Sequence, residues 1–442
     1  MTTLHIPVES ETLGNGLRVV VAPDRSAPVT TVGVYYQIGF RLEPRGRSGF
    51  AHLFEHMMFQ GSEHAGKTMH IKLINSSGGV LNGTTHYDIT NYFEAVPSNA
   101  LERVLWLEAD RMRALKVDEE NLRNQRDVVK EEVRVNVMNQ PYGGFPWLDL
   151  PPVAFRSWPN AHNFYGDFAD LDAATLEDVQ SFFRTYYAPN NAALLMLGDV
   201  DPGEALLFAK RYFEDIPPNS LTPRVDAGEP PQTEERRGEV PEKFGQLPAL
   251  AIAYHVPPRG SQEWHALAMF DRAVHGGPAG RIYRTLVLEK QIALDADGGI
   301  AYAATDLFDY DGPALMTTRI FHKPEYSSDQ TIAAHEAVIR DAQEKGIEAA
   351  ELEEVKVKFR SDFISSLESG DSSMPRFGLM HYLASFTLFE NDPTRINTVL
   401  DPFLAITPPQ AQAAAQKYLV KKNRAIVIRK PSAKPSGNGG SQ

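Results

Sequence analysis

The chain has 442 residues, about three times the commonest domain size, so we expect two domains. It carries 44 Lys and Arg against 57 Asp and Glu, and the net charge of −13 disfavours non-specific binding to nucleic acid or to an anionic membrane. The sequence contains no cysteine, which excludes disulfides and thiolate metal sites and leaves His, Asp and Glu as metal ligands.

The first twenty residues contain neither a basic segment nor an apolar one, so the sequence as given does not begin with a signal peptide. We therefore expect a cytoplasmic protein, or a periplasmic one if a leader has been removed. No stretch approaches the ~18 uninterrupted apolar residues that a transmembrane helix needs, so we expect no membrane association.

The segment 48–60 places two histidines and a glutamate in an otherwise apolar stretch. With Ser48 as N-cap it is predicted to be a helix, on which His52 and His56 share one face and can hold a single cation. Glu55 lies on a neighbouring edge, where it can reach a water on the metal without ligating the metal. A divalent cation would remove the cost of burying these titratable groups. The alternative is a chance cluster of hydrogen-bonded core histidines.

Residues 81–93 alternate apolar and polar side chains, which is the pattern of a β-strand. Asn82 and Gly83 also form a common turn dipeptide. A turn at these two positions is therefore the competing interpretation.

A third metal ligand is expected on the segment 118–141, which is predicted to be a long helix from the N-cap Asp118 to the terminating Pro141. Glu131 and Glu132 are adjacent, so helical phase separates them. Glu132 falls at the edge of the apolar stripe that contains Val129. Glu132 is thus the ligand candidate, and Glu131 is expected on the solvated face or in contact with a ligand.

Residues 175–199 and 407–431 can be superimposed without a gap, since each predicts a helix after a threonine, a turn with an asparagine, and an apolar strand. Two diverged copies of one unit explain this repeat. Strands alternate with helices without a phosphate-binding glycine loop, which favours an α+β architecture. We place the boundaries as follows: a catalytic domain at 1–220, a Pro-, Gly- and charge-rich linker at 221–243, a degenerate copy at 244–431, and a disordered tail at 432–442.

The sequence His52-Leu-Phe-Glu55-His56, followed 76 positions later by Glu132, resembles the inverted zinc motif of the insulinase/pitrilysin family of metallopeptidases. The likeness is strongest to the branch of the mitochondrial processing peptidase and its bacterial two-chain relatives, and it continues in the same order through residues 78–112, 124–132 and 186–202. It implies one Zn²⁺ per chain, with His52, His56 and Glu132 as ligands and Glu55 as general base. It also implies two similar α+β domains, each a mostly antiparallel sheet with helices packed on it.

The resemblance further implies a peptide hydrolase that acts on peptides or oligopeptides. Zn²⁺ would lower the pKa of a water ligand from about 15.7 to about 7 and polarise the peptide carbonyl, while Glu55 moves the proton. Asn82, Gly83 and Thr84 would lie on the edge strand to which an extended peptide adds. Many relatives carry a second glutamate where this chain has Gln125, which can still hydrogen-bond a ligand carboxylate.

The second half departs from the zinc motif. The residues that align with His52, Glu55 and His56 are, in order, Leu267, Phe270 and Asp271. Family members use their second half to contribute an Arg and a Tyr seven positions apart, and here Val287 and Leu294 occupy those positions. Neither side chain can donate a hydrogen bond. The nearby Arg281, Tyr283 and Arg284 match another part of the pattern and are expected on a helix surface.

This absence predicts the metal-bearing subunit of a heterodimer, whose partner is a similar chain that supplies the Arg/Tyr pair. A homodimer is the alternative assembly. A non-catalytic scaffold of the same fold is the alternative function, although such subunits usually lose part of the metal motif, which is complete here.

Overall fold

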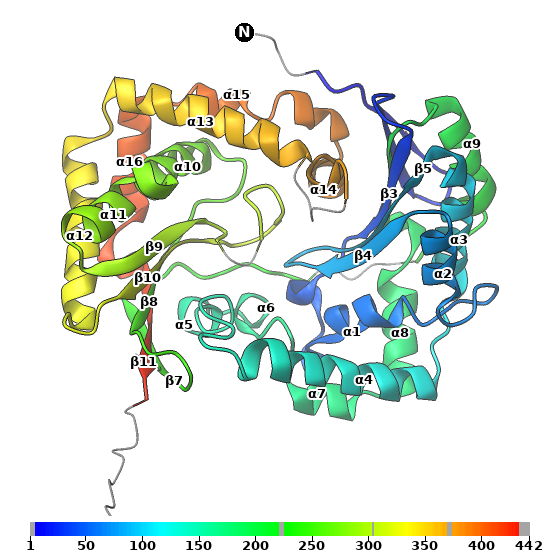
Figure 1. Ribbon diagram of the computed structural model, residues 1–442, viewed down its shortest axis with the longest axis horizontal. Coiled ribbons are helices and arrows are strands. Elements are labelled where there is room, and N and C mark those ends of the chain that lie inside the picture. Colours follow the sequence, from blue (N-terminus) through cyan, green and yellow to red (C-terminus); the bar gives the residue numbers. More distant parts are fainter. Residues whose placement is uncertain (1–4, 221–224, 303–304, 369–373, 433–442) are drawn as a thin grey trace, which may run out of the picture.

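The computed structural model describes residues 5–220, 225–302, 305–368 and 374–432. Two β-sheets with helices packed on them form the predicted α+β fold, one sheet in each half of the chain (Figure 1). The predicted disordered tail from residue 433 onward and residues 221–224 of the predicted linker lie outside the described residues. No helix in the described part of the chain is long and apolar enough to cross a membrane.

The first sheet has the strand order β1-β2-β6-β3-β5-β4, in which only β2 and β6 are parallel. Its strands are β1 (Glu9–Thr12), β2 (Arg18–Pro23), β3 (Val29–Tyr36), β4 (Val80–Thr85), β5 (Thr90–Pro97) and β6 (Ala192–Gly198). The second sheet has the order β7-β11-β8-β10-β9, in which only β7 and β11 are parallel. Its strands are β7 (Arg236–Glu242), β8 (Ala249–His255), β9 (Ala293–Ile300), β10 (Leu315–His322) and β11 (Arg424–Pro431).

The helices of the first half are α1 (Phe50–Met57), α2 (Met69–Ser76), α3 (Leu101–Ala114), α4 (Glu119–Val133) with a π-helical extension η3 (Arg134–Met138), α5 (Pro151–Ala154), α6 (Trp158–Ala161), α7 (Phe168–Ala173), α8 (Leu176–Tyr186) and α9 (Pro202–Phe213). Those of the second half are α10 (Gln262–His275), α11 (Arg281–Tyr283) with a π-helical extension η6 (Arg284–Glu289), α12 (Ser328–Lys345), α13 (Ala349–Glu368), α14 (Phe377–Ser385) with η7 (Phe386–Glu390), α15 (Asp401–Leu404) and α16 (Pro408–Tyr418).

The repeat predicted from the sequence appears as matching topology. The strand order from β2 to β4 equals that from β7 to β9, including the single parallel pair. Helices α8 and α16 both begin with a capping box. The following asparagines play the same part, because Asn191 donates to the carbonyls of Tyr186 and Gln37 while Asn423 donates to those of Tyr418 and His255.

Each sheet carries helices of its own half on one face and receives an element of the other half on the opposite face. Helix α14 packs against β3 and β6 of the first sheet (Figure 1). A Cβ on Gly33 of β3 would lie 2.6 Å from Sδ of Met380, so a larger residue there would displace the Met380 side chain of α14. Helix α5 packs in turn on β7 and β11, where Ala154 joins a cluster with Ala251 and Val427. The two halves are therefore joined through apolar packing.

Two sequence predictions need correction. Residues 81–93 form a hairpin and not one strand, because β4 ends at Thr85 and β5 begins at Thr90. The residues between them turn the chain. Residues 236–242 of the predicted linker are strand β7, which pairs with β11 and belongs to the second sheet. The side chains of β7 alternate between exposed and partly buried, as expected for an edge strand. This polar sequence gives a weaker strand signal than the apolar sequences of the neighbouring strands.

The turn between β4 and β5 is held against the end of β3. A Cβ on Gly39 would lie 2.3 Å from the carbonyl oxygen of His86 and 2.5 Å from that of Tyr87. Both are backbone atoms, so the clash can be relieved only by moving the backbone. We expect Gly39→Ala to lower the free energy of unfolding by about 1–3 kcal/mol or more. Gly66→Ala is the control, because nothing lies within 4 Å of a Cβ there. Chemical denaturation measures both; equal stability of the two variants would contradict the packing.

Candidate metal centre

The N-terminus of α1 is held by a buried carboxylate. Glu43 accepts hydrogen bonds from the backbone N–H groups of Gly49 and Ala51 at 2.8 Å and 2.7 Å. A negative charge at this end of a helix is stabilised by the helix dipole. Gly49, with a φ of 85°, is the N-cap. The prediction that Ser48 is the N-cap is therefore wrong. The hydroxyl of Ser48 donates to Asp170 at 2.5 Å and does not cap the helix.

The apolar side of α1 fixes its rotation. The ring of Phe54 stacks on those of Phe182 and Tyr187, each at 5.1 Å between centroids. The hydroxyl of Tyr92 donates to the carbonyl of Phe54 at 3.1 Å. With this side packed on α8 and the sheet, the face that carries His52 is turned toward α4.

Helix α4 presents the facing carboxylate. Asp118 accepts a hydrogen bond from the N–H of Asn121 at 2.8 Å, which confirms it as the N-cap. Val129 of the predicted apolar stripe is buried, and so is Val133, one helical turn later. The α-helix ends at Val133 and continues as a π-helical turn, so it stops short of the predicted end at Pro141.

The structure brings together the three residues predicted as metal ligands. Nε2 of His52 lies 3.7 Å from Oε1 of Glu132, and Nε2 of His56 lies 3.0 Å from Oε2 of the same carboxylate. One donor atom from each side chain falls within 4.8 Å of the others. The His52 side chain is 5% exposed, whereas those of His56 and Glu132 are 22% and 29% exposed, so the group is open to solvent on one side.

The electrostatics suit a cation. Burial, together with the neighbouring His56, lowers the pKa of His52 to about 4, so its imidazole is neutral at pH 7. The hydrogen bond from His56 keeps the pKa of Glu132 low and the carboxylate ionised. Nδ1 of His52 is buried without a hydrogen-bond partner among the described residues. Two imidazoles and one carboxylate with converging donor atoms fit the requirements of a zinc ion.

Glu55 lies beside this group and is oriented by a residue that the sequence patterns did not single out. The hydroxyl of Thr85 donates to Oε2 of Glu55 at 2.7 Å. Burial raises the pKa of Glu55 to about 7, against the opposing effect of that hydrogen bond. A Cβ on Gly83 would lie 3.4 Å from Cγ of Glu55, so β4 runs close beside this glutamate. The alternation of residues 81–93 was the available signal for Thr85, since it places 83 and 85 on one face.

Tyr165 is a second neighbour that the sequence did not reveal. Its ring lies 4.9 Å from that of His52 in an edge-on arrangement. Burial and the charges of Glu132 and Glu55 raise its pKa to about 12, so its hydroxyl stays protonated. Tyr165 belongs to the irregular segment between α6 and α7, where periodicity gives no signal.

The remaining predicted residues lie nearby in different settings. Glu131 points to solvent, 64% exposed, and pairs with Arg134 at 3.2 Å. Gln125 is buried on α4 about two helical turns before Glu132. Residues 82–84 lie on β4, the last strand in the order of the first sheet. The turn interpretation of Asn82 and Gly83 is wrong, because both pair with β5.

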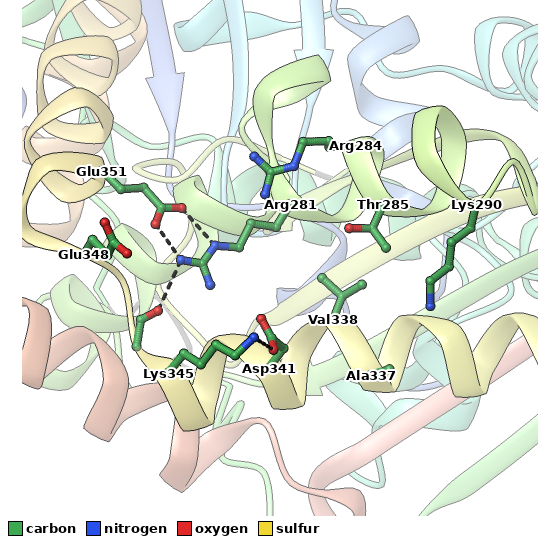
Figure 2. Close-up of a pocket in the computed structure, with 11 residues that line it drawn as sticks. Arg281, Arg284, Thr285, Lys290, Ala337, Val338, Asp341, Lys345, Glu348 and Glu351 are labelled. Atoms are coloured by element: carbon green, nitrogen blue, oxygen red, sulfur yellow. Dashed lines mark hydrogen bonds and ion pairs between the residues drawn. The ribbon is translucent and has the colours of Figure 1, made fainter.

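At the matching positions of the second half, apolar residues replace the two residues that align with His52 and Glu55. Leu267, Phe270 and Asp271 are buried on α10. Val287 is partly buried in η6, and Leu294 is 51% exposed on β9. Arg281 lines a surface pocket of about 560 Å³ and points to Glu351, to which it donates at 2.9 Å through Nε (Figure 2).

Comparison with known proteins places this site in a family. The model described as Insulinase (Peptidase family M16) matches residues 18–142, and the model described as Peptidase M16 inactive domain matches residues 173–359. Together they span more than half of the chain. The chain belongs to the insulinase (M16) family.

Similar proteins in this family carry names consistent with the site. The zinc protease PqqE of Helicobacter pylori is 28% identical over 426 residues, covering 96% of this chain and 93% of that protein. A probable mitochondrial-processing peptidase subunit beta of Arabidopsis thaliana is 30% identical over 221 residues, which are 50% of this chain and 41% of that protein. The crystal structure of a protease from Helicobacter pylori superimposes with a TM-score of 0.88 at 27% identity, over 97% of this chain and 100% of that one.

The adjacent residues Glu131 and Glu132 of α4 allow a controlled test of whether Glu132 is a metal ligand. Because Glu132 faces both imidazoles and Glu131 faces solvent, we expect Glu132→Ala to hold one zinc fewer per chain than Glu131→Ala. Elemental analysis of the purified variants gives the zinc content per chain. Equal zinc in both variants would show that the carboxylate of Glu132 is not a ligand.

Proposed function

We propose that this chain is the zinc-bearing subunit of a peptidase that hydrolyses peptide bonds in extended peptides or oligopeptides. The observation that carries the proposal is the convergence of His52, His56 and Glu132, with Glu55 beside them on the same helix. The names of the M16 relatives support zinc as the ion.

Glu55 has the position and acidity of a general base. Zinc, when bound by the three ligands, would supply Lewis acidity toward a water and toward the peptide carbonyl. One oxygen of Glu55 accepts the hydrogen bond from Thr85 at 2.7 Å, which fixes the carboxylate and leaves its other oxygen available to take a proton from the attacking water. The same carboxyl group then delivers that proton to the departing amine.

The edge strand β4 is suited to hold the substrate. A strand at the edge of a sheet presents unpaired backbone N–H and C=O groups, to which an extended peptide can add as a further strand. β4 is the last strand of the first sheet and passes beside Glu55 at Gly83. A peptide paired with residues 82–84 would therefore run past the metal ligands. Binding through main-chain groups fixes the path of the substrate more than its sequence.

A partner chain is part of the proposal. The M16 model that matches the second half describes an inactive domain, and Val287 and Leu294 stand where the resemblance calls for an Arg and a Tyr. An oxyanion that develops during hydrolysis needs hydrogen-bond donors, which these side chains lack. We therefore propose a heterodimer with a similar chain that supplies the pair. A homodimer would repeat the same deficiency in both copies.

A scaffold function is the less supported reading of the same fold. A subunit that only assembles has no need for two imidazoles, a carboxylate and a buried base at one place. Burial of Glu55, which raises its pKa to about 7 despite the hydrogen bond from Thr85, costs stability, and a catalytic role would explain why the residue is kept there.

Removal of the base tests the peptidase directly. We expect Glu55→Gln to keep the zinc content of the parent and to lower kcat for peptide cleavage by about 10²–10⁴-fold, because the amide cannot take a proton. Glu131→Gln, a change of the same kind on the solvated face of α4, is the control and should cleave like the parent. Cleavage is followed by mass spectrometry of a peptide mixture. Normal turnover by Glu55→Gln would assign the base to another group.

The need for a partner is tested by complementation. We expect the purified chain alone to hold zinc and cleave peptides at most weakly, and to gain activity when mixed with an M16 chain that carries the Arg/Tyr pair. Peptide cleavage against the molar ratio of the two chains should saturate near one to one. Full activity of the isolated chain, unchanged by the second chain, would refute the heterodimer.

A further inference from the structure

A second group of metal-ligating side chains joins the two halves of the chain. His86 lies in the turn between β4 and β5, Asp309 precedes β10, and His381 lies on α14. Nδ1 of His86 is 3.3 Å, and Nε2 of His381 is 2.9 Å, from the same oxygen Oδ2 of Asp309. One donor atom of each residue lies within 4.8 Å of the others.

The carboxylate at the centre is fixed by hydroxyl groups. The hydroxyl of Thr305 lies 2.7 Å from Oδ2 of Asp309, and that of Ser385, which donates to the carbonyl of His381 at 3.0 Å, lies 3.4 Å from Oδ1. Asp309 is fully buried and His381 is 7% exposed, while the side chain of His86 is 24% exposed. The group is thus ordered by its surroundings and reachable from solvent past one imidazole.

The hydrogen bonds around His86 determine which ring nitrogen carries its proton. The N–H and the hydroxyl of Thr84 both donate to Oδ1 of Asn91, at 3.1 Å and 2.8 Å. A hydroxyl has one hydrogen, so toward His86 the Thr84 oxygen can only accept, and Nε2 of His86 donates to it at 3.0 Å. The neutral ring then presents the lone pair of Nδ1 to the carboxylate of Asp309. Two lone pairs at 3.3 Å repel each other unless a positive charge lies between them.

One carboxylate oxygen faces both imidazoles. Nδ1 of His86 and Nε2 of His381 approach the same Oδ2 of Asp309 from different elements of the fold. A divalent cation at this place would bind all three donor atoms together.

Comparison with the other ligand-rich groups separates this one from an ordinary buried ion pair. In the candidate metal centre the two imidazole–carboxylate separations are 3.7 Å and 3.0 Å, close to those found here. In the group of His70, Glu94 and Glu108, the guanidinium of Arg111 already contacts both carboxylates. Asp309 has no ion pair with an Arg or Lys among the described residues.

A buried ring nitrogen of the group is left unpaired. Nδ1 of His381 has no hydrogen-bond partner in the described part of the chain. The ring of Tyr35 is 5.7 Å from that of His381. Buried polar groups of this kind usually bind an ordered water or ion.

We propose that His86, Asp309 and His381 form a second site for a divalent cation, which ties the turn after β4 to the second half of the chain. Two imidazoles and a carboxylate without a thiolate match the preferences of Zn²⁺. The role of the site is structural. It holds the turn together with existing contacts between the halves, in which the Asp88 carboxylate accepts from the N–H of Asp311 at 2.7 Å. This inference does not depend on the peptidase activity.

The test counts metal ions after the first site has been removed. A full-length His52→Ala/His56→Ala variant is stripped with a chelator, incubated with zinc sulfate and freed of excess metal. We expect it to retain one zinc per chain and to melt at a higher temperature with zinc than without. Adding His86→Asn and His381→Gln should abolish both effects. The parent should hold two zinc ions, and the His86→Asn/His381→Gln variant one.

His64→Asn controls for zinc bound by surface histidines, because the side chain of His64 is 61% exposed and pairs with Asp110, away from both proposed sites. It should leave the zinc content of every background unchanged. Absence of zinc from the His52→Ala/His56→Ala variant would overturn the proposal even if the variants at His86 and His381 failed to fold. Zinc that persists after all four substitutions would also overturn it, since the ion would then lie elsewhere. Neither result bears on the activity loss expected for Glu55→Gln.

Discussion

His52, His56 and Glu132 meet because α1 and α4 pack face to face, and that packing is set by side chains that take no part in chemistry. Phe54 fixes the rotation of α1 by stacking on the rings of Phe182 and Tyr187. Val129 is buried and orients the face of α4 that carries Glu132 toward α1. The arrangement leaves a carboxylate opposite two imidazoles in a partly dry setting. Such a set is stable only with a proton or a cation between its members, so the apolar packing itself creates a place suited to positive charge.

The sequence was sufficient for this part of the molecule because helical phase is a local property. Four-residue spacing puts His52 and His56 on one face, and the apolar stripe of α4 selects Glu132 over Glu131 before any tertiary contact is known. The internal repeat was equally accessible, since capping boxes and the asparagine turn are short-range signals. The structure extends that repeat to a shared strand order.

Features that depend on residues far apart in the chain could not be predicted from the sequence. The hairpin within 81–93 continues one alternating pattern through its turn, so periodicity alone could not divide it. Ser48 has the chemistry of an N-cap, but a carboxylate six residues before Gly49, that of Glu43, satisfies the helix terminus instead. Strand β7 is recognisable only once β11, about 190 residues later, is beside it. Tyr165 reaches His52 from an irregular segment that carries no periodic signal.

The turn after β4 contacts both the proposed base and the second half of the chain. Thr85, at its start, holds the oxygen of Glu55, and His86, the next residue, faces Asp309 and His381 of the second half. Because successive residues of a strand point to opposite sides, one backbone segment touches the proposed base on one side and the other half of the chain on the other. The hydroxyl that orients Glu55 and the imidazole that faces the second half therefore belong to neighbouring residues of one short segment. Contacts of the second half with His86 restrain the same stretch of backbone that positions Thr85.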